Sequence, residues 1–136
     1  MKLDFAFLAE AAVVNPQGIF NVLNGGLTQA LSRAFPSILP PMSLIARLHF
    51  DRDECDKSHH AIVTVFDPNR VCLFQSELDV NAPIHQYHPA TGNTFLAKFG
   101  FSSIETRMPG RYVCALAVDG LELSEVPFDI ILGVPS

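Results

Sequence analysis

The 136-residue chain contains no tryptophan, only two tyrosines and few charged residues. Lys, Arg, Asp and Glu make up 17% of it, against about 25% in an average soluble domain. Its nine basic residues are scattered and outnumbered by 14 acidic ones, for a net charge of -5. Nucleic-acid sites and polybasic membrane anchors need clustered positive charge. From the shortage of positive charge we therefore predict that the protein binds neither nucleic acid nor a membrane.

Cysteine is also scarce. The three cysteines, Cys55, Cys72 and Cys114, are odd in number and form no C-x-x-C pair. This excludes a disulfide framework and the common zinc templates. Cys72 and Cys114 lie in apolar runs, so they are predicted to be buried free thiols. Free thiols suit a reducing compartment, and the predicted location is the cytoplasm.

Long apolar runs are missing too. No uninterrupted stretch approaches the roughly 20 residues that cross a bilayer. The opening is apolar but broken by Asp4 and Glu10, and it lacks the pattern of a signal peptide. The length suits a single domain spanning residues 1–136. Yet 49% of the residues are hydrophobic. This surplus predicts a surface covered by a protein partner or by a second copy, as a homo-oligomer.

The clearest structural pattern is a hairpin near the end of the chain. Tyr112, Cys114, Leu116 and Val118 alternate as one face of a strand, and Asp119-Gly120 is typical of a two-residue type I′ turn. The return strand is expected to place four apolar side chains inward: Val126, Phe128, Ile130 and Leu132.

Similar alternation predicts further strands along the chain. They cover 43–50, 61–66, 71–80 and 94–104, after an opening hairpin of 3–14 and 19–23. A helix over 4–13 is the weaker alternative for the opening, and 28–35 is left as either helical turns or an edge strand. We therefore predict an all-β, antiparallel β-sandwich of about eight strands, with a β-barrel as the alternative.

Two expected strands carry specific burial predictions. In 43–50, one face is expected in the core and the other, which includes Ser43 and Ile45, in water. In 71–80, the even-numbered apolar side chains are expected to point into the core: Cys72, Phe74, Leu78 and Val80.

Potential metal ligands concentrate in two loops. Loop 51–60 contains Asp53, Cys55, His59 and His60, and loop 85–88 contains His85 and His88. Imidazole, thiolate and carboxylate groups together suit zinc. However, the spacing matches no established ligand template, and a solvated loop is the simpler interpretation. These six residues are low-ranking candidates for a divalent metal.

Patterns typical of catalysis are absent. No serine lies in a Gly-x-Ser-x-Gly elbow, and Asn24-Gly25-Gly26 is not followed by the lysine of a phosphate loop. We assign no catalytic or cofactor-binding residue and predict no cofactor. A triad assembled in space leaves no local signature, so enzymatic activity stays open but is not favoured.

Several motifs resemble those of a bacterial family of small proteins known only as a domain of unknown function. They are Ala9-Glu10-Ala11-Ala12, Gly18-Ile19-Phe20-Asn21-Val22, Asn24-Gly25-Gly26, His60 with Asp67, Pro109-Gly110-Arg111-Tyr112, Val118-Asp119-Gly120 and Val126-Pro127-Phe128. The resemblance implies an immunoglobulin-like sandwich. The motifs are turn and core positions, so no catalytic role is implied.

Two functions remain. A non-enzymatic protein-binding or assembly module is favoured by the apolar composition and the absence of a convergent polar constellation. The alternative is a metal- or small-ligand-binding protein that uses loops 51–60 and 85–88. The alternative requires the two loops to meet around a shared cavity.

Overall fold

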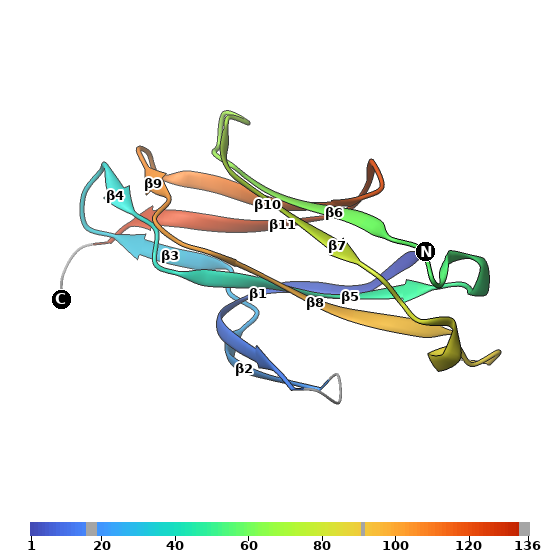
Figure 1. Ribbon diagram of the computed structural model, residues 1–136. Coiled ribbons are helices and arrows are strands. Elements are labelled where there is room, and N and C mark those ends of the chain that lie inside the picture. Colours follow the sequence, from blue (N-terminus) through green and yellow to red (C-terminus); the bar gives the residue numbers. More distant parts are fainter. Residues whose placement is uncertain (16–18, 91, 134–136) are drawn as a thin grey trace.

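The computed structural model describes residues 1–15, 19–90 and 92–133 and is built of β-strands (Figure 1). Two single-turn 3-10 helices, η1 (Arg52–Glu54) and η2 (Ile84–Gln86), lie in loops. The strands are β1 (Lys2–Val14), β2 (Phe20–Gly25), β3 (Gln29–Ser32), β4 (Ser37–Ile38), β5 (Met42–Phe50), β6 (His59–Phe66), β7 (Cys72–Val80), β8 (Asn93–Phe101), β9 (Glu105–Thr106), β10 (Gly110–Val118) and β11 (Leu121–Leu132). No helix within the described residues is long and apolar enough to cross a membrane.

The strands form two layers, which confirms the predicted β-sandwich. The first main sheet has the order β2-β1-β5-β8, and the second has the order β3-β11-β10-β6-β7. β4 and β9 form a separate two-stranded sheet. Neighbours are antiparallel except β3, which runs parallel to β11. Segment 28–35 therefore contains an edge strand, and the opening segment is a strand rather than a helix. β1 curls away from β5, and a curled sheet is also consistent with the alternative prediction of a β-barrel. The immunoglobulin-like topology stays a prediction.

The core lies between the two layers, where the predicted alternation is confirmed for the central strands. Leu44, Ala46, Leu48 and Phe50 of β5 are fully buried, as are Cys114, Leu116 and Val118 of β10. Tyr112 is also buried, and its hydroxyl donates a hydrogen bond to Met108 O at 2.7 Å. This bond satisfies the one polar atom of a side chain that otherwise fills the core.

The β10–β11 hairpin turns as predicted, because Asp119 and Gly120 have φ of 52° and 79°. Leu132 is an error in the prediction, since it is exposed at the end of β11. Cys72 and Leu78 are two more, since both are exposed on β7. The register of β6 and β7 shifts between Val65 and Phe66, so Cys72 lies opposite Phe66 on the outer face of the sheet.

A hairpin arm extends from the first sheet. β1 pairs with β5 only as far as Ala9, and its remaining residues pair with β2. In Figure 1 this arm, which comprises residues 10–14 of β1 and β2, lies on the outer side of β5 and β8. Its Phe20 and Val22 join a second apolar cluster with Ile45.

The arm changes which residues of β5 meet water. Ser43 and Ile45 were predicted to line a wet face, but both are buried. The reason is that β1 and β2 cover this part of the sheet, with Phe5, Phe7 and Phe20 within ring-contact distance of one another. The connection between the two strands of the predicted opening hairpin falls mostly on residues 16–18, outside the described residues.

Candidate functional site

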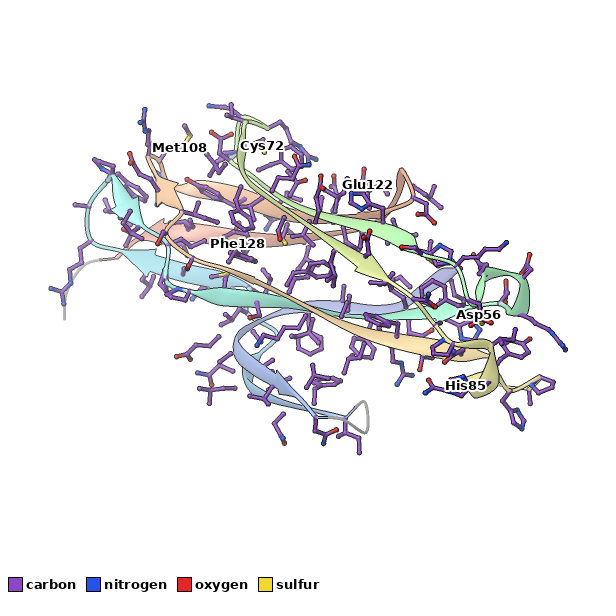
Figure 2. The ribbon with its side chains drawn as sticks, viewed as in Figure 1. Asp56, Cys72, His85, Met108, Glu122 and Phe128 are labelled. Carbon is purple, nitrogen blue, oxygen red and sulfur yellow. The ribbon has the colours of Figure 1, made fainter. Side chains whose placement is uncertain are left out.

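The two histidine-bearing loops lie at the same end of the sandwich. The backbone N–H of Asp56 donates to Ala82 O at 3.0 Å, and the Asp56 carboxylate accepts from the N–H of Ile84 at 2.9 Å. Figure 2 shows Asp56 and His85 at this end. The loops therefore lie together and are joined by two hydrogen bonds of Asp56, whereas the ligand-binding alternative requires them to meet around a shared cavity.

Both ring nitrogens of His59 have partners. Nδ1 lies 2.6 Å from Asp119 Oδ2, and Nε2 lies 2.7 Å from Glu54 O. A carbonyl and an ionised carboxylate only accept hydrogen bonds, so the arrangement requires the doubly protonated imidazolium. In that form the ring has no lone pair to offer a metal ion. The geometry thus indicates a structural role for His59, between the start of β6 and the β10–β11 turn.

The electrostatics agree with this geometry. Burial of the ring disfavours the charged form, but the hydrogen bonds to Glu54 O and Asp119 outweigh it and raise the pKa of His59 above its ordinary 6.5. The bond from His59, and a second from the His60 backbone N–H, lower the pKa of Asp119. The ring also lies 5.0 Å from that of Phe50.

The other predicted ligands are dispersed. His60 is exposed and bonds Asp79, Cys55 is buried and donates to Asp51 O, and His88 Nδ1 accepts from the N–H of Ala90. Among the described residues, one group of potential ligands is close enough to share an ion: Asp51, Asp53 and Glu54, with ligand atoms within 4.8 Å of one another. It contains only Asp53 of the six candidates, and the metal site stays a prediction.

The cysteines differ in accessibility, and we expect iodoacetamide to distinguish them. Burial raises the pKa of the Cys114 thiol to about 12, whereas Cys72 is exposed at the edge of its sheet. Native protein should take up one alkyl group, at Cys72, because the thiolate is the reactive species. Peptide mapping by mass spectrometry measures this, with urea-unfolded protein as the fully labelled control. Labelling of Cys114 in the native protein at the same rate as Cys72 would contradict the burial described.

The outward face of the arm carries the most prominent exposed apolar residues near one another. Val13 and Leu23 are 64% and 57% exposed, and Ile19 beside them is 63% exposed. A shallow cavity of about 240 Å³ lies between them, lined by residues 11–13 and 21–23. Single exposed apolar side chains are ordinary, but a group on a projecting hairpin indicates a contact surface.

The edges of the sheets also differ in charge. The edge strands β7 and β8 carry Glu77, Asp79 and Lys98, the kind of side chain that discourages edge-to-edge association. β2, the other edge of the first sheet, carries no charged residue. It is therefore an unprotected edge.

Two larger cavities lie where the arm leaves the sandwich. One, of about 380 Å³, is lined by residues of the arm and by Ser43, Lys98 and Gly100 of the sheet. The other, of about 510 Å³, is lined by Leu27, by residues 29–31 of β3 and by Pro40. Both include Glu10, Ala11, Pro41 and Met42, so they adjoin.

The amino-acid sequence carries a signal for this region that is separate from any catalytic motif. No charged residue occurs between Glu10 and Arg33. At the composition of this chain about four would be expected. A long uncharged segment that forms edge strands is a marker of an interaction surface.

A family model described as a family of unknown function (DUF6941) matches residues 4–131. No curated protein matches the chain.

Proposed function

The chain belongs to this family of unknown function, DUF6941, and we propose that it is a non-enzymatic assembly module that binds a second copy of itself. The β2 edge and the outward face of the arm form the contact. The observation that carries the proposal is that this edge has no charged side chain and lies beside exposed Val13, Ile19 and Leu23. We also propose a cytoplasmic location, because the three cysteines are free thiols.

A second copy fits this surface for reasons of symmetry. An antiparallel strand edge is complementary to itself, because a twofold axis places two identical edges in antiparallel register. Pairing would satisfy the free backbone groups of both β2 strands and bring the two Leu23 side chains out of water. The apolar composition of the chain supports burial of this kind.

The test is the mass of the protein in solution when Leu23 is replaced by lysine. We expect the wild type to sediment as a dimer at micromolar concentration and Leu23→Lys to weaken the dimer by about tenfold or more, because like charges would face each other at the edge. Sedimentation equilibrium measures both. The matched control is Leu121→Lys, at the β10–β11 turn, where the leucine is 60% exposed.

Amide hydrogen exchange supplies a second readout. Protection of the β2 amides should increase with protein concentration in the wild type and not in Leu23→Lys. A wild type that is strictly monomeric, or a dimer that Leu121→Lys weakens as much as Leu23→Lys does, is incompatible with the proposed contact.

A further inference from the structure

The arm has a second edge, on the side opposite β2. The pairing of β1 with β5 ends at Ala9, which lies opposite Ser43. From Ala9 to Val14, β1 pairs with β2. Along 10–14, therefore, β2 pairs with one side of β1, and no strand of the described residues pairs with the other. Backbone N–H and C=O groups of alternate residues face such an edge and can pair with an additional strand. One carbonyl of residues 10–14, Ala12 O, already accepts a hydrogen bond from Lys98 Nζ.

The two adjoining cavities lie along this edge. Both are lined by Glu10 and Ala11 of the edge itself and by Pro41 and Met42 opposite them. Prolines 40 and 41 have no N–H, so this segment of the chain cannot complete a strand ladder with the edge. The groove thus combines an open strand edge with space on either side of it.

The cavity on the sheet side has a mixed lining that includes a cation: apolar Met42, Phe74 and Phe101 lie in it together with Ser43 and Lys98. Ser43 is 6% exposed, and its hydroxyl, which has no hydrogen bond to any described residue, belongs to the cavity lining. Lys98 Nζ donates to Ala12 O at 2.8 Å, which leaves two of its N–H groups for a ligand. The Glu10 carboxylate, the acidic group in the lining, already accepts from the Asn24 side chain.

The cavity on the β3 side is apolar. Its walls are Leu27, Ala30, Leu31, Pro40 and Met42, with Gln29 and Glu10 as the polar members. Leu31 is 67% exposed in the absence of an occupant. An aliphatic side chain placed here would remove apolar surface from water on both partners.

We propose that this groove binds an extended peptide that adds as a strand along 10–14 of β1, with an acidic residue next to an aliphatic one. The open edge selects an extended backbone, because only a peptide offers alternating donors and acceptors at strand spacing. Successive side chains of a strand point to opposite faces. One therefore enters the cavity with Lys98 and Ser43, and its neighbour enters the apolar cavity. The site is separate from the proposed dimer contact, since it uses the opposite edge of the arm.

The test is selection of peptides from a random heptapeptide library displayed on phage, with the purified full chain as target. Selected peptides are then synthesised with blocked ends, and their binding is measured by fluorescence anisotropy. We expect enrichment of an acidic residue adjacent to an aliphatic one, and binding that survives Leu23→Lys. Survival in that variant separates this site from the dimer contact.

Two variants locate the peptide. Gly100→Leu fills the cavity beside Lys98, and an added Cβ would meet only Ser43 Oγ, at 3.8 Å. It should weaken binding at least tenfold while thermal unfolding shows an intact fold. Lys98→Met removes the cation and should weaken acidic peptides about tenfold. Lys57→Met, in the exposed loop after η1, is the matched control and should have no effect.

Three results would overturn the proposal. The first is that the library yields no enriched sequence. The second is that the enriched peptides bind both Gly100→Leu and Lys98→Met as tightly as the wild type. The third is that Lys57→Met weakens binding as much as Lys98→Met does, because the effect of Lys98 would then be general electrostatics rather than a contact in the groove.

Discussion

Replacement of Phe50 by alanine is expected to lower the free energy of unfolding by about 3–5 kcal/mol. Phe50 ends β5 with no exposed surface, belongs to the core between the two sheets and lies against the ring of His59. Removal of the ring loses its burial and leaves a cavity that rigid sheets cannot close. Urea unfolding followed by circular dichroism measures the change.

Phe66→Ala is the matched control for this prediction. Phe66 is also a phenylalanine at the end of a strand, but it is half-buried on the outer face of the second sheet, next to Arg70. We expect a loss of about 1–1.5 kcal/mol there, because much of the ring already meets water. Equal losses at the two positions would mean that the core does not lie between the sheets as described.

The second large effect concerns the pH dependence that His59 imposes. Its pKa is raised in the folded chain, so the folded state holds the proton more tightly than the unfolded state does. The resulting stabilisation is complete below the ordinary pKa of 6.5 and is lost as the pH rises through the raised value. The free energy of unfolding should therefore fall as the pH rises from 6.5 through the raised pKa of His59.

Asp119 produces the opposite effect at low pH. Its lowered pKa means that its contribution is present above the ordinary value of 3.8 and is lost as the pH falls through the lowered value. The network of His59, Asp119 and Glu54 O is thus fully formed between these two ordinary values. Two other side chains lie near His59. The ring of Phe50 is uncharged, and the carboxylate of Glu54 is paired with the amino group of Met1.

His59→Asn tests the network. At about pH 6 it should lower the free energy of unfolding by about 1.5–3 kcal/mol, because hydrogen bonds to a charged group are lost in a buried setting. Above pH 6.5 it should also flatten the pH dependence. His60→Gln is the control, since the His60 side chain is 46% exposed and its ion pairs with Asp79 and Glu77 are screened by water. A wild type whose stability is constant over this range would refute the role of His59.

Much of the fold could be predicted from the sequence, because the signals were local. The β10–β11 hairpin followed from alternating side chains and the Asp119-Gly120 turn, and both the turn and the buried face of β10 are confirmed. Exposure of Cys72 could not be predicted in the same way. A register shift against a neighbouring strand decides it, and alternation within β7 carries no information about its partner.

The candidate site was less accessible to sequence reasoning. The potential metal ligands pointed to the two histidine loops, but both ring nitrogens of His59 are hydrogen-bonded within the protein. The uncharged segment after Glu10 was the more informative signal for an interaction surface. Even so, the groove beside β1 could not be anticipated, because it is formed by β1, β3, β5 and β8 together.

Taken by itself, the sequence determined the class of fold, the terminal β10–β11 hairpin and the inward faces of β5 and β10. These properties depend on the period-two alternation of neighbouring residues, which any extended strand obeys. The tertiary structure decided which outer faces are covered, as at Ser43 and Ile45, and where β1 parts from β5. Those outcomes depend on packing between segments tens of residues apart, and local periodicity does not encode that packing.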